Sequence, residues 1–237
     1  IDIKAASKRN VIVTNTPDVV TDATAEIAML LILGASRRAV EGMQWARSKN
    51  WKWSVDFLIG KQLSGSRLGI LGMGRIGRAV AKRAKAFGME IHYHNRSKLD
   101  QDLEAGATYH DNIKSLFSIS DILSINCSAT KETKEIINKK TLEFFSKEAI
   151  ITNSARGDMI DDDAMVEALK SGKIFSLGLD VYNGEPNIHP EYLTLPNVFV
   201  LPHLGSATTK TRTAMGDLAV SNIEEFFKTG QCKNKIN

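Results

Sequence analysis

Cysteine, proline and long apolar runs are all scarce in this chain. It contains 2 cysteines and 5 prolines among 237 residues. Cys127 and Cys232 do not make a disulfide framework, so we expect reduced thiols in a reducing compartment and a cytoplasmic location. The apolar stretch from Ala25 to Ala35 is interrupted by Glu26, and no apolar run reaches the ~18 residues that a membrane helix needs. The sequence therefore predicts no membrane span.

An excess of charge of one sign is also lacking. The 31 lysines and arginines are scattered among 27 acidic residues, which leaves a net charge of +4. No basic run is interleaved with aromatic side chains, so we expect no nucleic-acid partner and only a mild attraction for anionic ligands. With 43% hydrophobic and 24% charged residues, the composition is ordinary for a globular protein.

A glycine-rich turn organises the rest of the chain. The apolar run from Leu68 to Leu71 predicts a buried strand, and it leads directly into Gly72-x-Gly74-x-x-Gly77 and a segment with helical spacing. In a dinucleotide-binding turn, the first glycine allows the tight turn, the second lets the backbone approach a pyrophosphate, and the third lets helix and strand pack closely. A tight turn in an unrelated α/β protein is the alternative interpretation.

Residues within this turn and about 20 residues after it indicate which dinucleotide would bind. The phosphates would lie on the N–H groups of Arg75 and Ile76, where the helix dipole favours negative charge. NAD-binding sites carry an acidic residue about 20 residues past the motif, whereas an arginine there accommodates a 2′-phosphate. Here Asn95, Arg96 and Ser97 take that place. We therefore predict NADP, with NAD as the alternative cofactor and a solvated basic turn as the other interpretation of these residues.

Strands and helices are expected to alternate along most of the chain. The hydrophobic pattern predicts strands at 11–13, 68–71, 90–94, 122–126, 148–153, 174–180 and 198–201. It predicts helices at 2–9, 21–36, 37–49, 75–87, 112–118, 138–146, 161–171 and 207–228. This alternation predicts the α/β class, with a Rossmann-type doubly wound parallel sheet and a ligand at the carboxyl ends of its strands.

Three charged or titratable residues follow expected strands on the side where the ligand would bind. They are Arg156, Glu185 and His203. An arginine offers a forked donor to a substrate carboxylate, and a histidine held by a glutamate can remain protonated near neutral pH and act as a general acid. A structural histidine at the end of a strand is the alternative for His203 taken alone.

Together these motifs resemble the D-isomer-specific 2-hydroxyacid dehydrogenase family, and within it the NADP-dependent glyoxylate/hydroxypyruvate reductases. The matching stretches cover essentially the whole chain: 14–17, 21–26, 72–77, 153–157, 180–186 and 202–208. The resemblance implies hydride transfer from NADPH to a small 2-keto acid such as glyoxylate or hydroxypyruvate, giving the D-2-hydroxy acid. It also implies an NAD(P)-binding Rossmann domain with remnants of a flavodoxin-like substrate domain.

The same resemblance implies roles for individual residues. Arg156 would bind the substrate carboxylate and carbonyl, His203 would protonate the carbonyl oxygen, and Glu185 would orient His203. Asp180 would hold the nicotinamide carboxamide. The cofactor trough would be lined by the backbone of Cys127, Ser128, Ala155 and Gly205 and by the side chain of Thr133.

The resemblance also predicts domain organisation and assembly. Residues 1–21 would be part of a substrate domain, 22–205 the NAD(P)-binding domain, and 206–237 a helix returning to the substrate domain. Family members carry about half of the substrate domain before the dipeptide that is Ile1-Asp2 here, so the chain resembles an N-terminally truncated member. The family dimerises through the long apolar helix and the arm reaching Gly60, so we expect a homodimer.

Several alternatives remain open at this stage. Phosphoglycerate, D-lactate and formate dehydrogenases belong to the same family, and so do the C-terminal-binding-protein corepressors, which sense nucleotides. No metal is expected. The carboxylates of 161–163 open a helix and are better explained by capping and the dipole, and His92 and His94 share a strand face without a third ligand at a suitable spacing.

Overall fold

The computed structural model describes residues 1–237 and divides into two compact units. One unit comprises Ile1–Ala23 and Ser206–Asn237, and the other comprises Thr24–Gly205. The first unit contains α1 (Ile3–Lys8) and α10 (Thr209–Thr229). Each of these helices is capped by the side chain of the residue before it, Asp2 for α1 and Thr208 for α10.

The strand expected at 11–13 is wrong. In the first unit this segment meets the C-terminal tail through one isolated antiparallel bridge, between Thr14 and Lys235. The N–H of Ile236 donates to the carbonyl of Val13, and the buried Asn222 side chain donates to the carbonyl of Asn15. Side chains therefore satisfy backbone groups that a neighbouring strand would otherwise pair, so no ladder develops.

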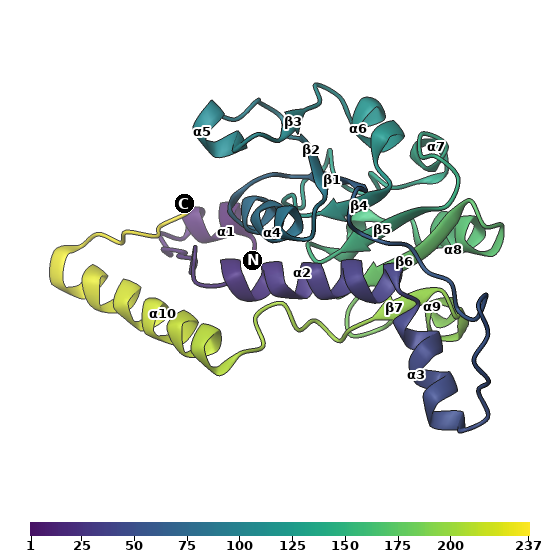
Figure 1. Ribbon diagram of the computed structural model, residues 1–237. Coiled ribbons are helices and arrows are strands. Elements are labelled where there is room, and N and C mark those ends of the chain that lie inside the picture. Colours follow the sequence, from purple (N-terminus) through teal and green to yellow (C-terminus); the bar gives the residue numbers. More distant parts are fainter. The chain divides into compact units, whose positions relative to one another are not determined.

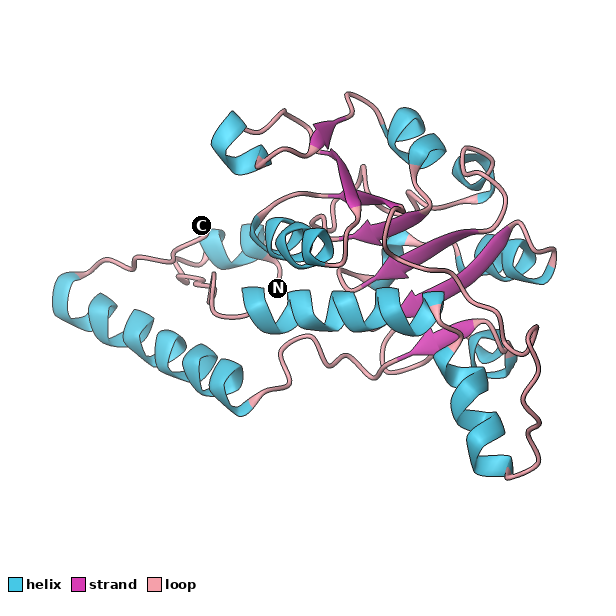
Figure 2. Ribbon diagram, viewed as in Figure 1, coloured by secondary structure: helices cyan, strands magenta, loops and turns pink.

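A seven-stranded sheet forms the centre of the second unit (Figures 1 and 2). The strand order is β3-β2-β1-β4-β5-β6-β7, and every pairing is parallel. The strands are β1 (Arg67–Leu71), β2 (Glu90–His94), β3 (Thr108–Tyr109), β4 (Ile122–Ile125), β5 (Ala149–Asn153), β6 (Ile174–Leu179) and β7 (Val198–Val200). A Rossmann-type parallel sheet is thus confirmed, because the order reverses at β1, which lies between β2 and β4.

Helices cover both faces of this sheet (Figure 1). On one face α2 (Thr21–Ser36) and α4 (Arg75–Ala86) share a core with Leu68, Ile70 and Ile122. On the other face α6 (Ile113–Ile119), α7 (Lys139–Leu142) and α8 (Asp162–Lys170) share a core with Leu123 and Ile151. Successive strand residues enter opposite cores, which is why these strands read as continuous apolar runs.

Short elements account for the main differences from the expected pattern. The strand β3 and the helices α5 (Gln101–Glu104) and α9 (Pro190–Thr194) were not predicted, because so few residues show no periodicity. The long amphipathic helix after α2 is a separate element, α3 (Ala39–Ser48). Arg38 separates the two helices, because its φ of 53° lies in the left-handed region and cannot continue a right-handed helix.

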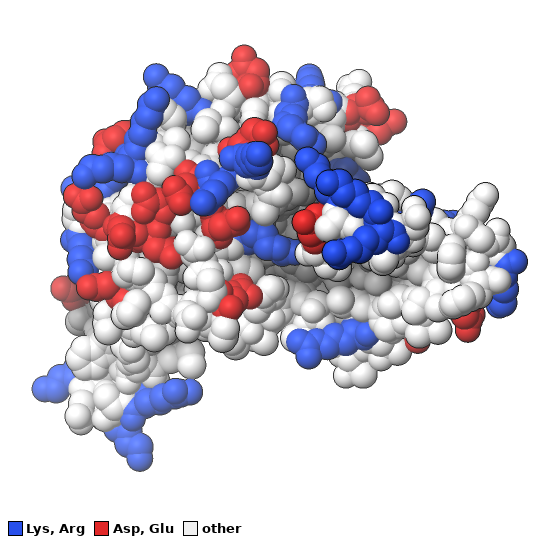
Figure 3. Space-filling view, turned by 180° about the vertical axis from the view of Figure 1, so that it is seen from behind, with Lys and Arg blue, Asp and Glu red and all other residues white.

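Acidic and basic side chains both occur across the face shown in Figure 3. None of the helices has both the length and the apolar character needed to cross a membrane. Both cysteines are free thiols.

Candidate functional site

The glycine turn after β1 shows which of its glycines the fold requires. Gly72 has a φ of +94°, and a Cβ there would lie 2.5 Å from the Cα of Cys127. A Cβ on Gly77 would lie 2.3 Å from the carbonyl oxygen of Gly72. Gly74 has an ordinary φ of −74°, and a Cβ there would meet no atom within 4 Å. Nothing inside the protein requires glycine at position 74, so the open space beside it is available for the close approach of a ligand.

The start of α4 is suited to an anion. The helix begins at Arg75, and Gly74 at the N-cap position has no side chain to accept from the N–H groups of the first turn. These N–H groups, including that of Ile76, belong to the positive end of the helix dipole. A pyrophosphate placed over Gly74 would therefore be favoured at this point.

A cavity of about 610 Å³ lies at this carboxyl edge of the sheet. Most of the residues expected to bind the cofactor line it, together with several that were not expected. The lining comprises Leu71, Gly72, Met73, Gly74, His94, Asn95, Arg96, Ser97, Leu99, Ile113, Asn126, Cys127, Ser128, Thr130, Glu132, Thr133 and Ile136. We call it the cofactor cleft, because it brings together the glycine turn and the end of β2 as the sequence predicted.

Asn95 has a structural role in the cofactor cleft that the sequence did not reveal. Its Oδ1 accepts a hydrogen bond of 2.7 Å from the N–H of Met73, inside the glycine turn. The side chain thus ties the end of β2 to the loop that would carry the pyrophosphate. A carboxylate could accept the same bond, so the spacing from the motif alone could not distinguish this role from contact with a ribose.

The opposite wall of the cofactor cleft is the loop after β4. The Thr133 hydroxyl donates to the carbonyl of Ser128 at 2.9 Å and accepts from the N–H of Thr130 at 2.8 Å, so Thr133 holds this loop in shape. Burial raises the pKa of the Cys127 thiol to about 11, so this side chain is an uncharged part of the wall. The Oδ1 of Asn126 is buried without a partner in the protein.

A second group of residues lies along the same edge of the sheet, after β5, β6 and β7. The Nδ1 of His203 lies 2.7 Å from Oε2 of Glu185. The other oxygen of Glu185 accepts from the N–H of Tyr182 at 3.0 Å. Burial alone would raise the pKa of Glu185, but hydrogen bonds from His203 and Tyr182 and the charges of His203 and Arg156 together lower it. Glu185 is therefore an ionised acceptor for the imidazole.

Asp180 holds the turn that carries His203. Its Oδ1 accepts from the N–H of Leu204 at 2.6 Å, and its Oδ2 accepts from the N–H of Gly205 at 2.8 Å. The residue is 1% exposed, and burial raises its pKa while the two backbone bonds oppose that rise. The carbonyl of Gly205 accepts in turn from the Thr24 hydroxyl. His203 itself has a φ of 55°, a conformation that the surrounding bonds must maintain.

Arg156 is presented by a turn that the buried Asn153 fixes at two points. The Nδ2 of Asn153 donates to the carbonyl of Arg156 at 2.8 Å, and its Oδ1 accepts from the N–H of Ala155 at 2.9 Å. A Cβ on Gly157 would lie 1.9 Å from the carbonyl carbon of Tyr182, so the loops after β5 and β6 touch there. The guanidinium is exposed and close enough to Glu185 for its charge to lower the pKa of that carboxyl.

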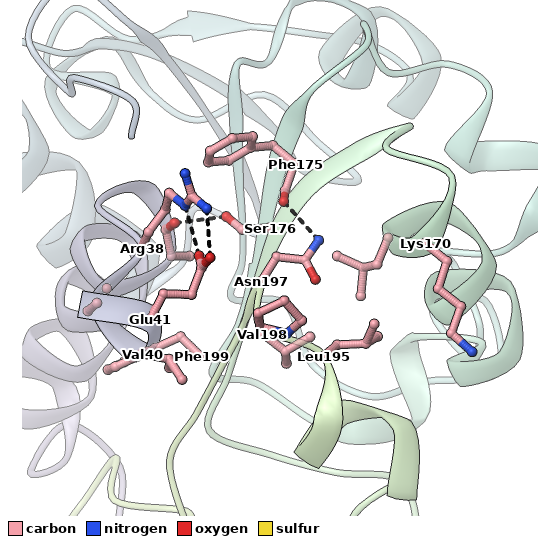
Figure 4. Close-up of a pocket in the computed structure, with 15 residues that line it drawn as sticks. Arg38, Val40, Glu41, Lys170, Phe175, Ser176, Leu195, Asn197, Val198 and Phe199 are labelled. Carbon is pink, nitrogen blue, oxygen red and sulfur yellow. Dashed lines mark hydrogen bonds and ion pairs between the residues drawn. The ribbon is translucent and has the colours of Figure 1, made fainter. Parts of the chain in front are cut away.

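A second cavity, of about 510 Å³, lies at the opposite edge of the sheet, near the amino ends of β6 and β7 (Figure 4). Its charged side chains already have partners. Arg38 makes a two-pronged ion pair with Glu41, and Lys170 pairs with Glu191. The side chain of Asn197 donates to the carbonyl of Phe175. None of the predicted site residues line this cavity.

The residues set aside as structural have identifiable partners. Asp161 caps α8 by accepting from the N–H of Ala164, whereas Asp162 is half-buried and accepts from the Tyr192 hydroxyl. The Nδ1 of His92 lies 3.0 Å from Nε2 of His110, a partner that spacing along one strand did not indicate. No group of three or more histidine, cysteine, aspartate or glutamate residues could hold a metal ion.

Comparison with known proteins shows the family of this chain. The sequence model described as the NAD binding domain of D-isomer specific 2-hydroxyacid dehydrogenase matches residues 29–205. This chain belongs to that family. It is therefore an oxidoreductase sequence with a Rossmann-type nicotinamide-cofactor domain.

Relatives of this dehydrogenase chain are similar along nearly its whole length. It is 44% identical to a glycerate dehydrogenase of Hyphomicrobium methylovorum, over 96% of this chain and 71% of that protein. It is 43% identical to a glyoxylate reductase of Thermococcus litoralis, over 100% of this chain and 73% of that protein. The crystal structure of an NADPH-dependent glyoxylate/hydroxypyruvate reductase of Sinorhizobium meliloti with NADP and malonate matches with a TM-score of 0.91 and 35% identity, over 100% of this chain and 73% of that one.

Proposed function

We propose that this protein transfers hydride from NADPH to a small 2-keto acid such as glyoxylate or hydroxypyruvate, giving the D-2-hydroxy acid. The observation that carries the proposal is the pair formed by His203 and Glu185, 2.7 Å apart, with Arg156 nearby. This group follows strands of the same sheet edge as the cofactor cleft. The names of the relatives support the substrate class.

In this mechanism the nicotinamide supplies the hydride, and the protein supplies binding and a proton. The guanidinium of Arg156 would bind the substrate carboxylate as a forked donor. Glu185 engages Nδ1 of His203, which leaves Nε2 as the nitrogen that would donate a proton to the carbonyl oxygen. The ionised Glu185 would also stabilise the imidazolium before the transfer, as a charged partner does in other acid–base pairs.

The residues of the cofactor cleft fit a nicotinamide dinucleotide. The space beside Gly74 and the N–H groups at the start of α4 suit the phosphates. For NADP rather than NAD we rely on Arg96 and Ser97, which line the cleft just after β2, at the position where NAD-binding sites carry an acidic residue and this chain has none. Backbone groups of Ser128, Ala155 and Gly205 and the buried Asp180 would complete the trough toward the nicotinamide.

We further propose that the unit of Ile1–Ala23 and Ser206–Asn237 belongs to the substrate-binding part of the enzyme. A homodimer is proposed through the region from α2 to Gly60. Seven large apolar side chains there are exposed in the single chain: Leu30, Met43, Trp45, Trp51, Trp53, Val55 and Ile59. Exposed apolar side chains in such number are typical of a protein interface.

The test of the proposed reaction is the variant His203→Asn. Removing a general acid typically costs ~10²–10⁴ in rate, so kcat for glyoxylate with NADPH should fall by that order while the Kd for NADPH stays near that of the wild type. His189→Asn is the matched control, since His189 lies beside Asp163 and outside the site. Normal turnover by His203→Asn would contradict the role of His203.

A further inference from the structure

The cofactor cleft contains one charge of each sign among its lining residues. Arg96 is the only lysine or arginine, and Glu132 is the only carboxylate. Arg96 follows β2, whereas Glu132 lies in the loop after β4 that forms the opposite wall. Two opposed charges in one cleft act together on any anionic group that enters it.

The loop that carries Glu132 is held in a defined shape. Thr133, its neighbour, bonds to both the carbonyl of Ser128 and the N–H of Thr130. A hydrogen bond from the Thr130 hydroxyl and a bond from its own backbone lower the pKa of Glu132; burial opposes them, and the charge of Arg96 adds the smallest lowering effect. Glu132 is thus a negative charge at neutral pH, and it lines the same cavity as Arg96.

The two nicotinamide dinucleotides, which carry a 2′-phosphate or a 2′-hydroxyl on the ribose, should differ in how the carboxylate of Glu132 affects their binding. A 2′-phosphate carries a charge of about −1.5 to −2 at pH 7, as phosphate monoesters do, and would be attracted by Arg96 but repelled by Glu132. A 2′-hydroxyl has no charge and can donate a hydrogen bond to a carboxylate. A cavity of about 610 Å³ is on the order of one Debye length across, ~8 Å at 0.15 M salt, so the repulsion is only partly screened.

We propose that Glu132 is a specificity-determining residue that weakens the binding of NADPH. It thereby reduces the preference for NADPH over NADH that Arg96 creates. The proposal rests on the proposed nicotinamide-dependent function. It assigns to the loop after β4 a part in cofactor choice, alongside the end of β2. The sequence did not indicate this, because Glu132 lies 36 residues beyond Arg96 in the chain.

The experiment compares Glu132→Gln with Glu135→Gln by fluorescence titration of NADPH and NADH. Both substitutions remove one exposed negative charge from the same loop, but Glu135 does not line the cleft. We expect Glu132→Gln to tighten NADPH binding about two- to tenfold, with NADH unchanged or weaker, since interactions of exposed charges at this range are modest. Glu135→Gln should change the ratio of the Kd values for NADPH and NADH by less than half as much as Glu132→Gln does.

Salt dependence provides a second readout. The gain in NADPH affinity of Glu132→Gln should shrink between 0.05 and 0.5 M salt, because screening removes the repulsion in the wild type. Equal shifts for NADPH and NADH, or equal effects of the two substitutions, would overturn the role of Glu132 while leaving the proposed reaction intact. If the wild-type protein binds neither nucleotide, the proposed cofactor fails and the role of Glu132 fails with it.

Discussion

His203 and Glu185 are joined by a contact of 2.7 Å between Nδ1 and Oε2, across 18 residues of sequence. The same carboxylate accepts from the N–H of Tyr182, so it is fixed at both oxygens. His203 is held from the other side by Asp180, which binds the two N–H groups that follow it in the chain. Glu185 thus orients the imidazole ring directly, and Asp180 fixes the backbone turn that carries His203.

The first prediction concerns Glu185. Replacing it with glutamine removes a charge-assisted hydrogen bond worth ~1.5–3 kcal/mol, so kcat/KM should fall roughly 10- to 150-fold. Because the folded protein lowers the pKa of Glu185 below its ordinary 4.5, the interaction is fully present above that pH and is lost as the pH falls through the lowered value.

A pH profile of kcat/KM checks this assignment. The wild-type activity should decline below about pH 4.5, the ordinary pKa of glutamate, as Glu185 becomes protonated, and Glu185→Gln should lack this decline. Glu191→Gln is the control, because Glu191 pairs with Lys170 away from the site. Profiles of the same shape for wild type and Glu185→Gln would contradict the role of Glu185.

The second prediction concerns Arg96. If it contacts a 2′-phosphate, Arg96→Ala should reduce the preference for NADPH over NADH by roughly 10- to 150-fold, the equivalent of a charged hydrogen bond of ~1.5–3 kcal/mol. Arg75→Ala, at the start of α4, is the control: it keeps the backbone N–H proposed for the pyrophosphate and should leave the NADPH to NADH preference unchanged. Isothermal titration with both cofactors measures the two ratios, and an unchanged ratio in Arg96→Ala would show that Arg96 does not select the cofactor.

The third prediction concerns Asp180. Substituting asparagine places an amide NH₂ against one of the two backbone N–H groups it now binds, and an unsatisfied buried donor costs ~1–3 kcal/mol. We expect a lower Tm and a fall in kcat, since the His203 turn loses one of its two anchors. Thermal unfolding and initial rates on the same sample test it. A variant with native Tm and full kcat would mean that the turn keeps its shape without Asp180.

The fourth prediction concerns His92 and His110, which contact each other on the β2–β3 edge. Burial lowers the pKa of both, and nearby charges of Glu90, Asp121 and Asp111 oppose this only in part. Since the folded state favours the neutral forms, their contribution to stability is present above the ordinary pKa of 6.5 and is lost as the pH falls through the lowered values. Urea unfolding should show a steeper loss of stability between pH 7 and 5 for the wild type than for His92→Gln, and parallel curves would refute this.

The fifth prediction concerns assembly. Trp45 in α3 and Trp51 and Trp53 in the arm that follows it are exposed. Light scattering at micromolar concentration should therefore give the mass of a dimer, twice 26.1 kDa. Trp53→Ser, at the most exposed of these positions, should shift the protein toward monomer. A monomeric wild type would count against the proposed interface.

Most of the second unit was predictable because its signals are local. Strands β1, β4 and β5 are largely apolar segments of four or five residues, and the glycine turn has a fixed spacing. The short elements β3, α5 and α9 were missed because their residues show no hydrophobic periodicity and depend on contacts with neighbouring segments. The strand expected at 11–13 failed for the converse reason, since its apolar residues pair with a tail and not with a sheet.

By itself the sequence determined the fold class, the edge of the sheet where the cofactor cleft lies, and the residue types that reach that edge. These follow from hydrophobic periodicity and from glycine geometry, which act over a few neighbouring residues. Only the tertiary structure decided that Asn95 binds the turn at Met73, that Asp180 binds the turn after His203, and that Glu132 shares a cleft with Arg96. Such contacts depend on how separate loops converge at adjacent strand ends, and no local pattern specifies which of their side chains will meet.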